Sequence, residues 1–141
     1  MSGYVQIPPD STGKKIETVE WTSGSDMLER QVVAQGGGLV TTLLSAVTAT
    51  GAGVSAQPKG TKRTFQAVGA TSGGTGTATV RVEVSNTGIT NEWLTLGTMT
   101  LALSTTAATD GFASDAVWPF VRGNVTAISG TGAAVTLTMG L

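Results

Sequence analysis

The side chains of this sequence that could do chemistry are carboxylates, a few basic groups and three tryptophans, because it contains neither histidine nor cysteine. Their absence removes the commonest general base and metal ligand, and excludes disulfides and thiolate metal sites. Glu83 and Glu92 lie on neighbouring predicted strands and could face each other, as glycoside hydrolysis requires. Such residues are ordinarily solvent-facing strand charges, and we interpret them so. We therefore predict no catalytic residues.

Two further clusters of charge have simple structural interpretations. Asp110 and Asp115 bracket the segment DGFASD, but their spacing matches no calcium-loop signature, and Asp-Gly is an ordinary turn dipeptide. Lys59, Lys62 and Arg63 provide too little positive charge for a nucleic-acid groove, and the net charge is only -1. We expect this basic cluster to decorate the start of a strand. The sequence thus predicts no metal site, no cofactor and no nucleic-acid partner.

The tryptophans of the central and C-terminal regions are candidates for sugar binding, because small β-sandwiches often bind carbohydrate with exposed aromatic rings. Trp118 precedes Pro119 and the apolar pair Phe120-Val121, which favours packing in a core or an interface. Trp93 begins a predicted strand directly after a loop. Trp93 is therefore the predicted glycan contact.

The composition is typical of an all-β domain. Threonine and valine favour strands, and glycine favours turns. Charged residues make up 12% of the chain, about half the ~25% of an average soluble domain. Residues 1–15 lack the pattern of a signal peptide, and the apolar run 39–53 is too short and too polar to span a membrane. We expect a protein made in a cytoplasm, without a membrane partner.

Residues 1–37 are predicted to form an extended N-terminal arm that contains eight of the seventeen charged residues. The pair Pro8-Pro9 enforces extended backbone, and KKIETVEW alternates as a short strand does. Residues 25–33 allow two alternatives, a short helix capped by Ser25 or a strand through Val32 and Val33. Glycines 36–38 are expected to form a flexible joint.

Residues 38–141 are predicted to form an antiparallel β-sandwich or jelly-roll-like domain, because short alternating runs follow one another between glycine-rich turns. In TATVRVEVS, Ala78, Val80, Val82 and Val84 point one way, while Arg81 and Glu83 mark the solvent face. The last two strands, joined by a Gly/Thr/Ser turn, are expected to form a hairpin. The expected strands are residues 41–48, 61–68, 78–85, 92–101, 111–113, 117–128 and 133–139.

The small number of charged residues in this domain indicates that it associates with other chains. Exposed strands are normally guarded by Lys, Glu or Pro, yet only nine charged residues lie in residues 38–141. We infer that copies of the chain or a larger assembly cover much of the surface, and that the arm becomes ordered on docking. The arm residues predicted to contact the larger assembly or another subunit are Tyr4, Val5, Ile7, Pro8, Pro9, Ile16, Val19 and Trp21.

Both ends of the sequence resemble known virion proteins. IPPDSTGKKIETVEW, followed by VVAQGG, resembles the N-terminal segment of small virion proteins of tailed bacteriophages. The closing DGFASDAVWPFVRGNVTAISGTGAAVTLTMG is similar to the end of small β-sandwich proteins encoded among phage head and tail genes. The middle, residues 53–77, lies outside the resemblance. The resemblance implies a capsid decoration (cement) protein, a head fibre or a tail-associated adaptor, none of which has catalytic residues.

The resulting hypothesis is a structural virion protein that binds the outer shell as a homo-oligomer, a dimer or trimer, and stabilises it. Its partner would be the major capsid protein or another virion protein, and its location the virion. Whatever binds only the assembled shell raises the stability of that shell. Two alternatives stay open: a tail- or fibre-associated structural protein, and a carbohydrate-binding module for attachment to the host surface.

Overall fold

The computed structural model describes residues 17–23, 26–32 and 38–141, and these ranges contain strands and connections but no helix. The all-β prediction is thereby confirmed. Contacts along the chain divide it into two units, residues 1–37 and residues 38–141. Each unit is described by itself.

The first unit contains a two-stranded antiparallel hairpin. Its strands are β1 (Glu17–Ser23) and β2 (Asp26–Val32), with Trp21 paired to Leu28 and Ser23 paired to Asp26. The strand is therefore the alternative adopted over Asp26–Val32, where the sequence also allowed a helix.

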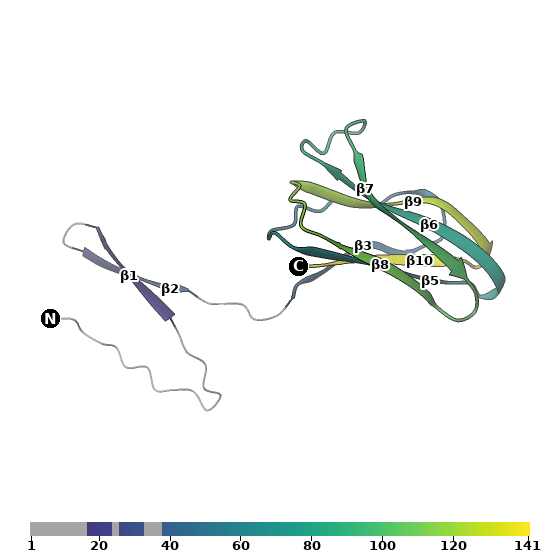
Figure 1. Ribbon diagram of the computed structural model, residues 1–141, viewed down its shortest axis with the longest axis horizontal. Coiled ribbons are helices and arrows are strands. Elements are labelled where there is room, and N and C mark those ends of the chain that lie inside the picture. The colour runs from purple at the N-terminus through teal and green to yellow at the C-terminus, as the bar shows by residue number, and fades with distance from the viewer. Residues whose placement is uncertain (1–16, 24–25, 33–37) are drawn as a thin grey trace, which may run out of the picture. The chain divides into compact units, whose positions relative to one another are not determined.

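The second unit is a sandwich of two four-stranded sheets, as predicted (Figure 1). One sheet has the strand order β3-β10-β5-β8 and the other has the order β4-β9-β6-β7, with all neighbours antiparallel. The strands are β3 (Val40–Val47), β4 (Gly51–Ala52), β5 (Arg63–Ala70), β6 (Gly73–Ser85), β7 (Leu94–Leu103), β8 (Ala108–Ser114), β9 (Phe120–Thr131) and β10 (Ala134–Gly140).

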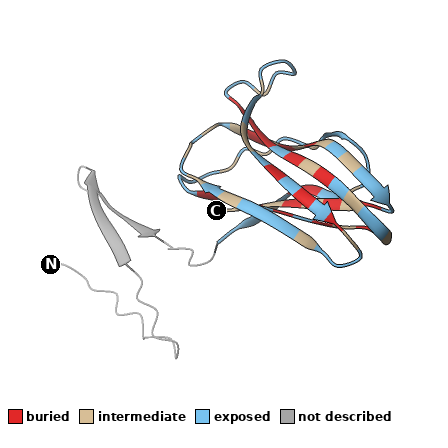
Figure 2. Cartoon of the chain, turned by 45° about the vertical axis from the view of Figure 1, so that its right-hand side comes forward, coloured by how far each residue is buried: buried red, intermediate tan, exposed pale blue. Residues whose placement is uncertain are grey.

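The core lies between the two sheets and follows the alternation of the sequence. Figure 2 shows buried residues alternating with exposed ones along the strands. The predicted inward positions of β6 are confirmed, since Val80, Val82 and Val84 are at most 1% exposed. Each such side chain contributes roughly 1.5–3 kcal/mol by leaving water. The facing sheet contributes Phe65, Leu137 and Met139.

Most connections of the sandwich carry the chain from one sheet to the other. Only β6 and β7 follow each other in one sheet, while the other six connections between β3 and β10 change sheets. The predicted closing hairpin is therefore wrong, because β9 pairs with β6 and β4, whereas β10 pairs with β3 and β5. Alternation fixes which face of a strand is buried, but it does not choose the neighbouring strand.

Several strand boundaries differ from the predicted ones, and the changed start of β7 lies beside a bulge. In the β6–β7 pair, Val82 lies opposite Gly97 and Glu83 opposite Thr95, which leaves Leu96 without a partner. The extra residue interrupts the alternation and brings Leu94 opposite Val84, and Leu94 is 58% exposed. Strand β7 begins at Leu94 rather than at residue 92. The two-residue strand β4 was not predicted, because Gly51-Ala52 has no strand propensity.

The edges of the two sheets are closed against each other on one flank of the sandwich. The Asp110 carboxylate on β8 accepts a hydrogen bond from the backbone N–H of Thr100 on β7, at 3.2 Å. The Phe112 ring lies where a side chain at Gly97 would be, and it packs against Phe65 with the ring centroids 5.1 Å apart. A carboxylate and an aromatic ring thus cover the free edge of β7.

Candidate functional site

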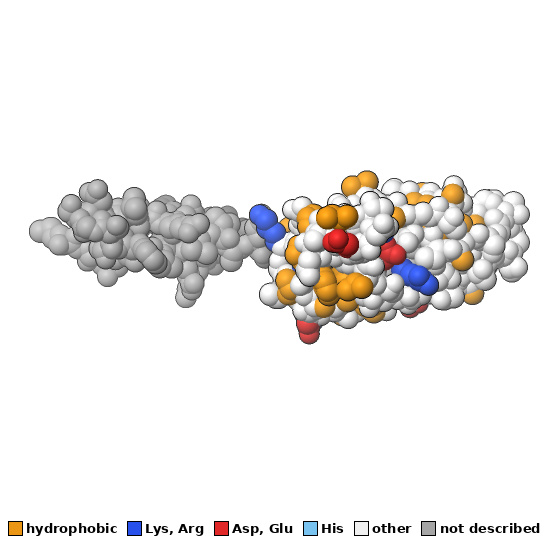
Figure 3. Space-filling model, turned by 90° about the horizontal axis from the view of Figure 1, so that it is seen from above, with side chains coloured by type: hydrophobic (Ala, Val, Ile, Leu, Met, Phe, Trp, Pro, Cys, Tyr) orange, Lys and Arg blue, Asp and Glu red, His pale blue; other side chains and the backbone are white. Residues whose placement is uncertain are grey.

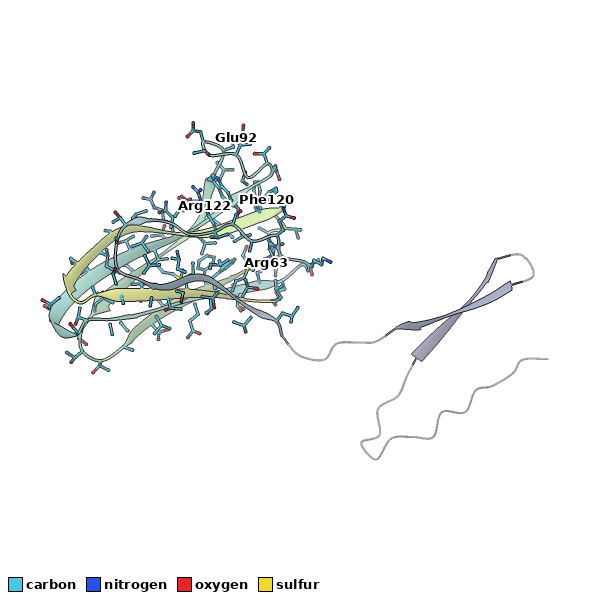
Figure 4. All side chains as sticks on the ribbon, turned by 180° about the vertical axis from the view of Figure 1, so that it is seen from behind. Arg63, Glu92, Phe120 and Arg122 are labelled. Carbon is cyan, nitrogen blue, oxygen red and sulfur yellow. The ribbon has the colours of Figure 1, made fainter. Side chains whose placement is uncertain are left out.

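Three connections and one chain entry meet at one end of the sandwich, which we call the loop end. They are residues 53–62 between β4 and β5, residues 86–93 between β6 and β7, residues 115–119 between β8 and β9, and the entry into β3 at residues 38–39. The registers set them side by side, because Arg63 pairs with Ser114 and Ser85 pairs with Phe120. Figure 4 shows Arg63, Phe120, Arg122 and Glu92 together at this end.

A buried arginine holds two of these connections. Arg63 is 1% exposed, and its guanidinium donates to the carbonyl oxygens of Ala116 at 3.4 Å, Trp118 at 3.3 Å and Pro58 at 3.5 Å. Burial lowers the pKa of Arg63 from its ordinary value because the charged form loses its water. Carbonyl dipoles, rather than a carboxylate, surround the guanidinium, so it binds backbone segments that are distant in sequence.

The burial of Arg63 differs from the prediction that the basic cluster decorates the start of a strand. Arg63 does begin β5, but it is a buried clamp rather than a surface decoration, while its neighbours Lys59 and Lys62 are exposed. The prediction failed because the carbonyl groups around Arg63 come from residues 58 and 116–118. Trp118, by contrast, packs against the core as its sequence context predicted.

The loop between β6 and β7 is ordered by its own side chains. The buried Ser85 hydroxyl accepts hydrogen bonds from the backbone N–H groups of Thr87 at 3.2 Å and Gly88 at 3.0 Å. Gly88 has a φ of 74°, which favours glycine, and the Phe120 ring lies beneath it. Thr87 also donates to the Glu92 carboxylate. The loop is thus fixed at both of its ends.

A second charged cluster lies beside this loop. The Glu83 carboxylate accepts from Arg122 Nε at 2.8 Å and from Asn124 Nδ2 at 2.8 Å. The Arg122 guanidinium lies over the Trp93 ring, 4.1 Å from its centroid, a cation–π geometry. Glu83 is only 8% exposed, so the interpretation of Glu83 as a solvent-facing charge is wrong. It faces outward from β6, as predicted, but Arg122 and Asn124 from β9 cover it.

These contacts limit what the predicted chemical residues can do. Both carboxylate oxygens of Glu83 are engaged, and Glu92 lies in the β6–β7 loop rather than on a strand. Trp93 is half-buried, and Arg122 covers one face of its ring. Its use as a glycan contact stays a prediction, and Arg122 would have to leave the covered face before a sugar could stack there.

The loop end also contains most of the exposed apolar surface of the sandwich. Of seven large hydrophobic side chains exposed in residues 38–141, six lie at this end. The view onto the β6–β7 loop in Figure 3 shows hydrophobic side chains gathered around an acidic one. The six are Leu39, Val40, Val54, Ile89, Leu94 and Val117. Periodicity did not predict this cluster, because four of the six lie outside the strands.

The predicted contact residues of the arm belong to the first unit, residues 1–37. Those that lie outside the described residues are Tyr4, Val5, Ile7, Pro8, Pro9 and Ile16. Val19 and Trp21 belong to β1, which is described as a strand only. Their role as contacts stays a prediction.

Residues 17–23, 26–32 and 38–141 contain neither an acidic metal cluster nor a membrane-spanning helix. No three acidic side chains there lie close enough together to hold a metal ion. Asp110 binds backbone N–H groups of Thr100 and Gly111 with its carboxylate oxygens. Nor do those ranges contain a helix of the length and hydropathy that crossing a bilayer requires.

No protein-family model matches this chain, and no curated protein matches it in sequence. Among solved structures, the chain is similar to the crystal structure of PBSX exported protein XepA, with a TM-score of 0.43 and 15% sequence identity. The similarity covers 99% of this chain and 50% of XepA, so the chain spans about half the length of that protein.

Proposed function

We propose that this chain is a structural virion protein of a tailed bacteriophage, most simply a capsid decoration protein that binds the outer shell as a homo-oligomer. The resemblance of both ends of the sequence to phage virion proteins supports the class. The gathering of six exposed apolar side chains at the loop end supports the mode of binding. Contiguous exposed apolar surface is typical of a protein–protein interface.

The loop end suits docking because it is ordered before it binds. The Arg63 clamp and the Ser85 turn fix residues 56–60, 86–93 and 115–119 in one arrangement. A pre-ordered loop loses less conformational entropy when it binds, so more of the contact energy contributes to affinity. Binding that requires the assembled shell then stabilises the shell by mass action.

The test uses particles that lack the protein and purified chain added back to them. Complete particles should release DNA at a higher temperature than particles without the protein, and added chain should restore the difference. Ile89→Asp and Leu94→Asp place a charge on the exposed apolar surface and should weaken binding about tenfold or more, which corresponds to about 1.4 kcal/mol. Thr106→Asp, at an exposed position of the opposite end of the sandwich, should bind normally.

Other outcomes identify the competing functions. Particles that rupture no sooner without the protein contradict a cement role, and a copy number of a few per particle then indicates a tail component. Binding to a glycan array that Trp93→Ala abolishes indicates a carbohydrate-binding module.

A further inference from the structure

The outward face of the sheet β3-β10-β5-β8 is neutral, and we call it the neutral face. Of the charged residues on these strands, Arg63 is buried and Asp110 turns toward β7. The outward side chains are small or uncharged along every strand, and none is longer than that of Gln66. Its central members are Thr42, Thr64, Gln66, Val68, Thr109 and Thr138.

The other sheet differs in this respect. The outward side of β4-β9-β6-β7 bears Arg81, which is exposed, and the Glu83–Arg122 ion pair. The strand charges of the sandwich that face outward are therefore confined to one of its two faces. A strand face that meets water permanently ordinarily bears charge, which prevents association.

Several polar groups of the neutral face already have partners within it. Gln66 Nε2 donates to the Thr109 hydroxyl at 3.2 Å, and the Thr138 hydroxyl donates to the Gln66 carbonyl at 3.4 Å. The Thr136 hydroxyl accepts from the backbone N–H of Ala46 at 3.1 Å. Burying a polar group that is already hydrogen-bonded costs much less than burying an unpartnered one. These groups can thus leave water without new polar contacts.

We propose that the neutral face packs against the same face of a second copy of this chain. In a two-fold interface the same face of each copy packs against the other, and residues near the axis lie close to their own counterparts. Like charges near the axis would oppose this contact, and the neutral face has none. A charged partner would find no complementary charge here, which favours a copy as the occupant. The inference rests on the proposed function, because it supplies the interface of the proposed homo-oligomer.

The size of the face predicts a weak dimer. Four strands at about 4.8 Å spacing and seven residues at about 3.4 Å rise give a projected area of roughly 450 Å². A standard interface buries about 800 Å² on each partner. Self-association in free solution should therefore require high concentration, whereas copies bound side by side on one shell would have a raised effective concentration.

The experiment is sedimentation velocity of the full chain without particles, from about 10 µM to about 1 mM. The weight-average mass should rise toward that of a dimer. Gln66→Glu and Val68→Lys should each weaken the association about tenfold or more, because they set like charges face to face. Thr98→Glu, exposed on the opposite face beside Arg81, should leave association unchanged. Circular dichroism checks folding, and two variants are used so that one remains if the other unfolds.

The outcomes separate this inference from the proposed function. A mass that stays at one chain up to about 1 mM overturns the inference, and so does an equal loss of association in Thr98→Glu and Gln66→Glu. A dimer that binds no particle leaves the inference standing and contradicts the proposed function. A strictly monomeric chain that still stabilises the shell overturns the inference, and it leaves the shell-binding part of the proposed function standing.

Discussion

The two ends of the sandwich are built differently. The end opposite the loop end, which we call the turn end, consists of residues 48–50, 71–72, 104–107 and 132–133, all of them Thr, Ser, Gly or Ala. Its turns are closed by short local bonds, such as that from the Thr71 hydroxyl to the Gly74 carbonyl at 3.0 Å. The loop end has longer connections, held by the side chain of Arg63.

The difference indicates that the two ends of the sandwich have different roles. At the turn end, small residues allow the sheets to be connected closely, and the hydrogen bonds come from both backbone groups and Ser and Thr hydroxyls. At the loop end, one buried side chain organises segments that expose apolar residues. Binding residues commonly lie on connections that a rigid scaffold positions. Substitutions at the two ends should therefore have different consequences.

The largest effect is expected from Arg63→Ala. The substitution leaves a cavity and three carbonyl groups without their donor, and should lower the free energy of unfolding by about 4 kcal/mol. Urea denaturation measures the loss. Hydrogen exchange should speed up in residues 56–60 and 115–119 while the turn end stays protected. Lys62→Ala, at an exposed position, should change stability by less than about 0.5 kcal/mol. Equal losses of stability in Arg63→Ala and Lys62→Ala would contradict the role of Arg63 in holding these segments.

Gly76→Ala is the matching test near the turn end. An added Cβ would meet the backbone carbonyl of Ser129, which cannot move aside as a side chain can. We expect a loss of about 3 kcal/mol, measured by thermal denaturation. The control is Gly73→Ala, where nothing lies near the new methyl group and φ is not positive. That variant should be neutral or slightly more stable. A neutral Gly76→Ala variant would show that β6 and β9 are not closely fitted near this end.

A smaller effect is expected from Glu83→Gln, which keeps the shape but breaks the ion pair with Arg122. The loss should be about 1–2 kcal/mol, and tryptophan emission should shift as Arg122 leaves the Trp93 ring. A double-mutant cycle with Arg122→Met should give a coupling energy of about 1 kcal/mol. Arg81→Gln, at an exposed position, should cost less than about 0.5 kcal/mol. Strict additivity in the cycle would mean that the pair contributes nothing.

The smallest effect is a gain in stability. Ala46, near the turn end of β3, has a φ of 46°, a conformation that costs a residue with a Cβ about 1–2 kcal/mol. Ala46→Gly should therefore raise the free energy of unfolding by about 0.5 kcal/mol after the greater freedom of glycine in the unfolded chain is counted. Ala49→Gly, where φ is not positive, should lower it slightly. A loss of stability in Ala46→Gly would contradict the strain at this position.

Alternation predicted the parts of the fold that depend on a single strand. The inward set of β6 and the all-β class follow from residues 78–85 and from the Thr/Val composition. Alternation also placed Glu83 on the correct face. It could not show that Arg122 and Asn124, about forty positions away, would cover that carboxylate.

The candidate site was less predictable, because it is made of segments that are far apart in the sequence. Nothing near Arg63 indicates that the carbonyl groups of Ala116 and Trp118 will surround it. The exposed apolar residues Val54, Ile89 and Val117 lie in connections, where no period marks them. Only the pairing of strands brings these three connections to one end.

The order β3-β10-β5-β8 places the last strand of the sandwich between two earlier ones. On a translating ribosome, β3 and β5 must therefore remain without their shared neighbour until residue 140 has emerged from the exit tunnel. During that interval the apolar sides of both strands are exposed to other nascent chains and to chaperones. The yield of correctly folded protein should depend on how quickly residues 134–140 are synthesised, so slow codons just before β10 would be harmful.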